Sequence, residues 1–438
     1  MSLEILGLVL IGVLFVVILA GFPISFTLFF LAMAFGYYGL GDRVFHLMTY
    51  QYFSTMMETV LAAVALFTFM GYVLESSGLM GRLFHAIQLA FGRRHGSLYV
   101  ATIFTATLFA AATGIVGASV AIIGLMAGPI MQKRGYDTAL SAGTITAGGT
   151  LGILIPPSVM LVVMGPSFQV SIARLYAAAI LPGLLLSFLY LIYTLGRTWL
   201  RPQLGPPLPA DELNVSKGYI LKELIVGFLP PTFLILLTLG AIISGWATPT
   251  EGAALGCLGA ILITALNGQL SFIVLKDAAY RTAQTTAMVM ILLAASTFLG
   301  SVFSAFGTPK FLADTILEWN IPPGLLIVSI LAICFLLGWP LEWVPIVVII
   351  VPIFLPLLQA LQVDMIWFSI LVAVTLQTCW LSPPVALSAY YLKAVVPSWD
   401  LWQIYRGMMP FMVLQWACVL LIYFIPDIAL YLPTLWYR

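Results

Sequence analysis

Charged residues are scarce in this chain of 438 residues. Only 8% of them are Asp, Glu, Lys or Arg, and 62% are hydrophobic, whereas a soluble domain has about 25% charged and about 45–50% apolar residues. Such a chain cannot build a water-exposed surface all round. The formal net charge of +1, without a basic stripe, argues against a nucleic-acid partner. The composition therefore predicts an all-α polytopic protein embedded in the lipid bilayer.

Histidine and cysteine are also few, which argues against an enzyme. His46, His85 and His95 lie near the ends of apolar segments, and neither an HExxH motif nor a nucleotide-binding loop is present. The four cysteines lie in or beside apolar runs without the spacing of metal ligands, so we interpret them as small core residues. Glu4 stands where a signal peptide would carry Lys or Arg, so the first apolar segment is expected to be a retained transmembrane helix.

The second half of the chain repeats features of the first half at a constant offset in the numbering (356 − 129 = 227). Identical residues at this offset are Pro129 and Pro356, Gln132 and Gln359, Asp137 and Asp364, and the doublets Pro156-Pro157 and Pro383-Pro384. The apolar segments follow the same register: 3–20, 22–40, 56–75, 99–131, 139–165 and 173–196, then 224–243, 248–266, 285–305, 324–358, 365–392 and 409–425. We therefore expect one helical unit to occur twice, as in many secondary transporters.

The fourth segment of each half is too long for one span and too short for two. Segments 99–131 and 324–358 carry glycine or proline near their centres, at Gly114 and Gly117 and at Gly338, Pro340 and Pro345. This pattern predicts a re-entrant hairpin in each half. Each half then has five transmembrane crossings, and because five is odd, the two halves must have inverted topology.

Two shorter, mixed stretches precede the third and ninth apolar segments. Residues 42–55 and 271–282 combine aromatic, charged and polar residues. We expect each to form a separate helix in the plane of the interface. Their side chains Tyr50, Tyr52, Lys276 and Arg281 would then reach lipid headgroups.

The distribution of Lys and Arg predicts the orientation. With the hairpins counted as above, 13 of the 17 residues fall on the side opposite the N-terminus, and the other side has Arg43, Arg174, Lys310 and Arg438. Because cytoplasmic loops are enriched in Lys and Arg, both termini are expected to be periplasmic. The predicted domains are a first repeat (1–200), a cytoplasmic linker (201–222) and a second repeat (223–438).

Each hairpin tip, packed beside a helix broken at a Pro-Pro doublet, is a candidate cation site. A broken helix frees carbonyl oxygens that can bind an alkali cation without a fixed charge, and Pro156 and Pro157 would leave the carbonyls near positions 152 and 153 unpaired. The candidate cation ligands are Thr113, Gly114, Gly117, Ser119, Gly149, Thr150 and Pro156 in the first half, and Gly338, Pro340, Thr375, Thr378 and Pro383 in the second. Helix N-termini near the bilayer midplane would favour an anionic solute, with Ser158, Gln377 and Ser382 as candidate substrate contacts.

Structural interpretations stay open for several of these residues. Glycine and proline also act as packing points and kinks in membrane helices, so the small residues from Gly143 to Gly152 are candidates for helix packing alone. Glu342, beside the second tip, is either close to a ligand or exposed at the tip.

Several stretches resemble one known family, the large membrane subunit (DctM type) of tripartite ATP-independent periplasmic (TRAP) transporters. They are GFPISFTL from Gly21, AATGIVGASVAIIGLMAGPIMQKRGYD from Ala111, SAGTITAGGTLGILIPPSVMLVVMG from Ser141, SGWATPTEGAALG from Ser244 and SPPVA from Ser382. The resemblance covers nearly the whole chain. It implies a sodium-driven elevator in the bacterial inner membrane. It also implies a small four-helix membrane subunit and a periplasmic solute-binding protein that delivers a small organic anion bearing a carboxylate.

A second hypothesis is a stand-alone sodium- or proton-coupled carrier for dicarboxylates or oxyanions. Such a carrier would have the same repeats and hairpins but no partner subunits. A channel is less favoured because the sequence contains no repeated ring of pore-lining charges.

Overall fold

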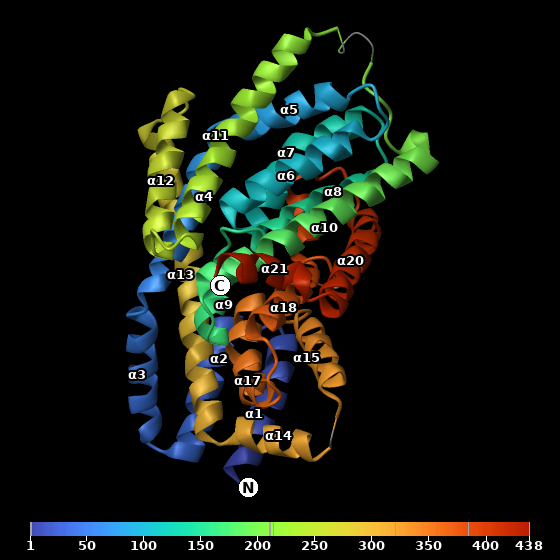
Figure 1. Cartoon of the computed structure of the whole chain (residues 1–438). Coiled ribbons are helices and arrows are strands. Elements are labelled where there is room, and N and C mark those ends of the chain that lie inside the picture. The colour runs from blue at the N-terminus through green and yellow to red at the C-terminus, as the bar shows by residue number, and fades with distance from the viewer. Residues whose placement is uncertain (1, 210–211, 213, 320, 384, 438) are drawn as a thin grey trace.

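The computed structural model describes residues 2–209, 212, 214–319, 321–383 and 385–437, without the side chains of 110–113 and 349–352. Its first half consists of helices with short connections (Figure 1). They are α1 (Leu3–Leu19), α2 (Ile24–Leu40), α3 (Arg43–Met56), α4 (Ala62–Glu75), α5 (Leu79–Phe91), α6 (Ser97–Thr113), α7 (Val116–Lys133), α8 (Thr138–Thr150), α9 (Val159–Phe168) and α10 (Ile172–Leu200).

In the part that the structure describes, the second half also consists of helices with short connections. Its elements are α11 (Lys217–Ile243), α12 (Pro249–Leu266), α13 (Phe272–Ala305), α14 (Thr308–Glu318), α15 (Pro323–Leu337), α16 (Trp343–Pro345), a π-helical segment (Ile346–Ile350), α17 (Val351–Ala360), α18 (Met365–Cys379), α19 (Leu387–Val395), α20 (Leu401–Phe424) and α21 (Asp427–Trp436). Short 3₁₀ turns lie at Thr59–Leu61, Leu151–Ile153 and Pro202–Leu204.

Helix boundaries in the two halves differ by the same offset as the sequence repeat. Helix α8 begins at Thr138 and α18 at Met365, a difference of 365 − 138 = 227. Helix α7 covers 116–133, and the segment made of α16, the π-helical turns and α17 covers 343–360, so both bounds are shifted equally (343 − 116 = 360 − 133 = 227). The packing repeats as well. Helix α8 packs on α20 in the same way that their counterparts α18 and α10 pack on each other. Helices α4 and α12 also pack on each other, and so do their counterparts α13 and α2. Figure 1 shows α8 beside α20 and α12 beside α4.

Aspartates at equivalent positions precede α8 and α18. Asp137 precedes α8 and accepts a hydrogen bond from the Leu140 amide at 2.7 Å. Asp364 precedes α18 and accepts from the Ile366 and Trp367 amides, each at 2.9 Å. An aspartate at this position satisfies amides that have no partner within the helix. The identity of these two residues in the sequence thus has a local structural cause.

Six described helices are long and apolar enough to cross a membrane, or seven if the bent pair α3–α4 forms one span. Helices α3 and α4 meet at 53°, which agrees with a separate helix before the third apolar segment. The corresponding expectation for the second half was wrong. Residues 272–305 form one continuous helix of 34 residues, α13. No proline interrupts this stretch and its one glycine, Gly300, lies near its end, so nothing breaks the helix.

The linker between the halves packs against the end of the first hairpin, which we define as α6 and α7. The Leu208 amide donates to the Gly92 carbonyl at 2.8 Å, and the Asp137 amide donates to the Leu204 carbonyl at 3.1 Å. Arg134, at the end of α7, forms an ion pair with Glu212. The Arg134 guanidinium holds the pKa of the Glu212 carboxyl below its ordinary range. The linker is therefore docked on the first half and does not hang free between the halves.

Candidate cation and solute site

The tip of the first hairpin lies against the break in the first broken helix, α8–α9. Helix α6 ends at Thr113, whose side chain lies outside the described part, and Gly114 follows with a φ of +62°. A Cβ on Gly114 would lie 3.6 Å from the Pro157 carbonyl oxygen and 3.5 Å from the Val159 amide nitrogen. The left-handed backbone, which favours glycine, thus turns the chain beside the break. Pro156 is buried in the same break, between the end of α8 and the start of α9.

The second arm of the first hairpin contacts the end of α8. A Cβ on Gly149 would overlap the Val120 side chain and lie 3.0 Å from the Val120 amide nitrogen. Ser119, the neighbour of Val120, is buried, and so is Thr150, the last residue of α8. The structure therefore brings Ser119, Gly149 and Thr150 into one buried region.

One expected free carbonyl in the first break is occupied. The Ser158 hydroxyl donates to the Ile153 carbonyl and accepts from the Leu161 amide. The expectation that the carbonyl at position 153 is unpaired was therefore wrong, because a side chain replaces the amide that proline lacks. Ser158, a candidate substrate contact, is fully buried and acts in this conformation as the N-cap of α9.

The second half has a comparable arrangement. The second hairpin consists of α15 and the residues from Trp343 to Ala360, and its tip begins at Gly338. A Cβ on Gly338 would overlap the sulfur of Cys379 at the end of α18, so this tip lies against the break of the second broken helix, α18–α19. Pro340 is in the turn of the tip, and Pro383 is in the break.

Hydroxyl groups lie buried at the end of α18 and in this break. Thr378 donates to the Thr375 carbonyl, and Ser382 donates to the Thr378 carbonyl at 2.8 Å. The hydroxyl oxygen of Thr375 is buried and has no hydrogen-bond partner among the described atoms. An unpartnered buried oxygen is costly, and a bound cation or water would satisfy it.

The two broken helices meet at residues that occupy the same position in each half. Gln377 Nε2 donates to the Thr150 carbonyl oxygen at 2.7 Å, and the two residues are 377 − 150 = 227 positions apart. Gln415 Nε2, on α20, approaches the Thr150 hydroxyl at 3.4 Å. The amide oxygens of Gln377 and Gln415 are buried without a partner in the part of the chain that is described. Neutral oxygens of this kind suit a hard monovalent cation.

Sequence analysis missed two residues of this region, Gln415 and Tyr391. Gln415 is the lone amide inside the apolar stretch MVLQWACV, and an isolated polar residue in a membrane helix is a signal that could have been used. Tyr391, on α19, contacts the first hairpin, because a Cβ on Gly117 would lie 2.8 Å from the tyrosine ring. Glu342, half-buried, is the residue immediately before α16.

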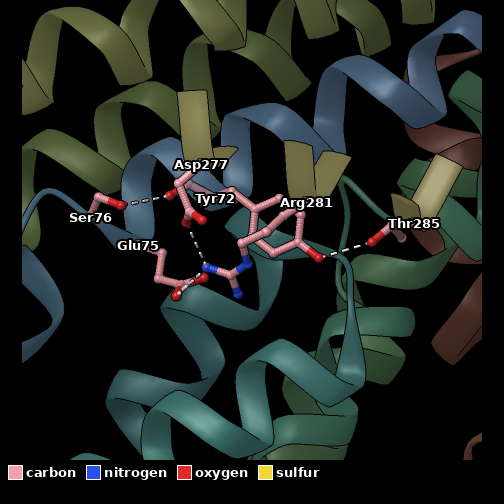
Figure 2. Close-up of polar contacts among 6 residues, drawn as sticks. All are labelled: Tyr72, Glu75, Ser76, Asp277, Arg281 and Thr285. Carbon is pink, nitrogen blue, oxygen red and sulfur yellow. Dashed lines mark hydrogen bonds and ion pairs between the residues drawn. The ribbon is translucent and has the colours of Figure 1, made fainter. Parts of the chain in front are cut away.

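A polar cluster joins α4 and α13 (Figure 2). Arg281 Nη1 lies 3.0 Å from Glu75 Oε1 and 3.8 Å from Asp277 Oδ2. The guanidinium carbon lies 4.1 Å from the centre of the Tyr72 ring, and the Tyr72 hydroxyl bonds Thr285 at 3.0 Å. The expectation that Arg281 reaches lipid headgroups was therefore wrong, since its charge is used between helices.

A cavity of about 620 Å³ lies between α3, α9, α13 and the second arm of the second hairpin. Polar groups of α3 and α13 contribute to its wall, including Ser54, Glu58, Thr297 and Ser301. Ser54 and Glu58 occupy the positions equivalent to Arg281 and Thr285 of the polar cluster (281 − 54 = 285 − 58 = 227). At equivalent positions, one half thus has an ion-paired cluster and the other has an open space with both polar and apolar side chains in its wall.

Comparison with known families agrees with this architecture. The family described as tripartite ATP-independent periplasmic transporter, DctM component, matches residues 11–428. The chain belongs to this family. As a DctM-type component it is a multi-pass membrane protein, and family membership implies secondary transport of organic acids.

Relatives of this DctM-type chain include transporters with different named solutes. The C4-dicarboxylate TRAP transporter large permease protein DctM of Pseudomonas aeruginosa is 28% identical over 87% of this chain and 88% of its own length. The isethionate TRAP transporter permease protein DctMQ of Oleidesulfovibrio alaskensis is 29% identical over 86% of this chain, which spans 59% of that longer protein.

A solved structure has a similar fold. The crystal structure of the YdaH transporter of Alcanivorax borkumensis aligns with a TM-score of 0.62 at 16% identity, covering 89% of this chain and 90% of that one. This likeness concerns the fold alone.

Proposed function

We propose that this chain imports a small organic anion across the bacterial inner membrane, driven by a sodium gradient. In this proposal the two halves are inverted repeats, each with five crossings and one re-entrant hairpin. The hairpins and broken helices form a transport domain that moves as an elevator against the remaining helices. Both termini are periplasmic, as the distribution of Lys and Arg predicts.

The observation that carries the proposal is the contact between Gln377 and Thr150. When two repeats are related by a pseudo-two-fold axis, a residue meets its own counterpart only close to that axis. The contact therefore supports an axis that passes between the ends of α8 and α18. Inverted repeats in transporters are related by such an axis, with the solute and ion sites at their interface.

The chemistry around this axis supports a cation that moves with the solute. Each broken helix ends beside a hairpin tip, and the buried groups whose contacts are described there are hydroxyls, amides and backbone carbonyls. One carboxylate, that of the half-buried Glu342, also lies at the second tip. Neutral oxygens bind Na⁺ without leaving a permanent charge in the bilayer when the ion departs. The cavity beside the second hairpin, whose wall includes the hydroxyls of Ser54, Thr297 and Ser301, supports a space that the solute could enter.

The solute class and the partners rest on the relatives. One relative is named for C4-dicarboxylates and another for isethionate, and both names denote small organic anions. The longer DctMQ protein extends beyond the region matched here, which supports a small membrane subunit as a separate partner of this chain. A periplasmic solute-binding protein completes the proposed assembly.

Uptake into proteoliposomes tests the proposal. The chain is reconstituted with its small subunit and binding protein, and uptake of radiolabelled succinate and isethionate is measured with an inward sodium gradient. We expect uptake to collapse when choline replaces sodium outside. Uptake that persists without sodium, or without the binding protein and the small subunit, would favour the stand-alone carrier instead.

A further inference from the structure

The carbonyl of Thr150 lies at the point where α8 stops being an α-helix. Beyond it the chain makes a 3₁₀ turn, and the Leu154 and Ile155 amides both donate to the Leu151 carbonyl. In a continuous helix the Leu154 amide would donate to the Thr150 carbonyl. Here it donates to the Leu151 carbonyl instead. The Gln377 side chain, from the other half of the chain, donates to this carbonyl at 2.7 Å.

The orientation of the Gln377 amide follows from this partner. A carbonyl accepts but cannot donate, so the NH₂ group must face Thr150 and the amide oxygen must face away. That oxygen has no partner in the described part of the chain. Gln377 thus binds the break of one half with its nitrogen and presents a free acceptor on its other side.

Gln377 also belongs to the last turn of α18, between two residues of the second candidate site. Thr375 and Thr378 are two positions before it and one after it, and all three side chains are buried. A shift of the first break would move the Thr150 carbonyl, which would pull on Gln377 and on the turn that carries these hydroxyls. One hydrogen bond is therefore shared between the two candidate cation sites.

We propose that Gln377 is a positioning residue that makes sodium binding at the two sites cooperative, an inference that rests on the proposed sodium coupling. A cation that orders the first break fixes the Thr150 carbonyl and, through it, the end of α18. The second cation then binds a site that is already ordered, so its binding no longer loses the conformational entropy of ordering the end of α18. Neither ion needs to touch the other for this coupling.

Gln88 provides a matched control. It is a buried glutamine of α5 and is not among the residues assigned to either candidate cation site. The variants Gln377→Met and Gln88→Met each remove one amide and keep nearly the same volume. Gln377→Asn is a second variant that keeps the amide but shortens its reach.

Sodium titration of the purified complex, in a choline chloride background of constant ionic strength, tests the inference. The signal is tryptophan fluorescence, with thermal stability at each sodium concentration as a second readout. We expect a Hill coefficient of about 2 for the natural chain. For Gln377→Met and Gln377→Asn it should fall toward 1 with a higher half-saturating concentration, and Gln88→Met should behave as the natural chain does.

Each remaining outcome has a distinct meaning. A Hill coefficient near 1 in the natural chain, or an unchanged coefficient in folded Gln377→Met and Gln377→Asn, overturns the coupling role and leaves sodium transport intact. An equal loss in Gln88→Met overturns it too, because the removal of any buried amide would then have the same effect. No sodium response at all in the natural chain contradicts the proposed function itself.

Discussion

Gly143 on α8 and Gly407 on α20 pack backbone to backbone. A Cβ on Gly143 would overlap the Gly407 carbonyl oxygen, and a Cβ on Gly407 would overlap the Ala139 carbonyl oxygen. Small residues let membrane helices approach this closely. For Gly143, the packing interpretation of the small residues in this stretch is therefore confirmed.

Gly143→Ala is expected to destabilise the protein. The added methyl group has no space, and the obstacle is backbone, which cannot rotate away, so the α8–α20 contact must open at a cost of about 1–3 kcal/mol. Thermal unfolding in detergent measures the effect. Gly240→Ala on α11 is the control, because a Cβ there would meet nothing within 4 Å. Equal melting temperatures for the two variants would contradict the prediction.

Gly149→Val and Ser119→Ala are expected to abolish sodium-coupled uptake while the complex still assembles. Any side chain at Gly149 would push against Val120 and so displace Ser119, its neighbour in the first hairpin. Ser119→Ala removes a candidate oxygen ligand from the same buried region. Uptake in proteoliposomes, with size-exclusion chromatography to verify assembly, measures both. Normal uptake in both variants would refute the assignment of the first cation site.

Arg281→Leu is expected to destabilise the contact between α4 and α13. The substitution leaves the carboxylate of Glu75, whose side chain is only 16% exposed, without its partner. Removing one member of a fully buried pair costs about 3–5 kcal/mol, and the 34% exposure of Arg281 reduces this to roughly 1–3 kcal/mol.

A double-mutant cycle isolates the Arg281–Glu75 pair from other effects of the substitution. The variant with both Arg281→Leu and Glu75→Leu should recover part of the lost stability, because no uncompensated charge remains. Lys276→Leu, an exposed substitution on the same helix, is the control and should change little. Strictly additive effects of the two single changes would show that the pair contributes nothing.

The docked linker is expected to loosen in acid. The hydrogen bond from Arg134 lowers the pKa of Glu212 below its ordinary value of 4.5, so the folded form binds the proton less readily than the unfolded form. The stabilising contribution is therefore complete above pH 4.5 and is lost as the pH falls through the lowered pKa.

Hydrogen exchange of the Leu208 and Gly96 amides, corrected for intrinsic rates, measures this loosening. Both amides form hydrogen bonds between the linker and the first half. The Leu208 amide donates to the Gly92 carbonyl, and the Gly96 amide donates to the Gly205 carbonyl. Glu212→Gln should show faster exchange already at neutral pH, and the distant Glu318→Gln should not. Exchange independent of pH in the natural chain would contradict a role for the Arg134–Glu212 pair.

Sequence alone located several of the places where this chain departs from regular helix. The breaks at Gly114 and at 338–342 lie within the segments expected to form hairpins, and the Pro156-Pro157 doublet lies between α8 and α9. Glycine and proline act locally through the backbone, so they mark candidate breaks without knowledge of the fold. They do not always break a helix, because the Pro230-Pro231 doublet lies inside the continuous helix α11. The membrane topology and the ion ligands stay predictions.

Contacts between distant elements could not be predicted in the same way. The approach of Gln377 to Thr150 depends on how α18 packs against the end of α8, and the pairing of Arg281 with Glu75 depends on the rotation of α13. An amphipathic stretch such as 271–282 has the same pattern whether it lies at an interface or continues a helix. The structure decides such cases through packing partners that lie in the other half of the chain.

The unbroken course of α13 ties opposite ends of the molecule together. Its 34 residues give a rod of about 51 Å, longer than the hydrocarbon layer of about 30 Å. Arg281 stands near one end, and Thr297 and Ser301 of the cavity wall stand toward the other. Helix α13 lacks the bend that separates α3 from α4. A tilt imposed where Arg281 meets Glu75 is therefore expected to be transmitted along α13 to the wall of the cavity.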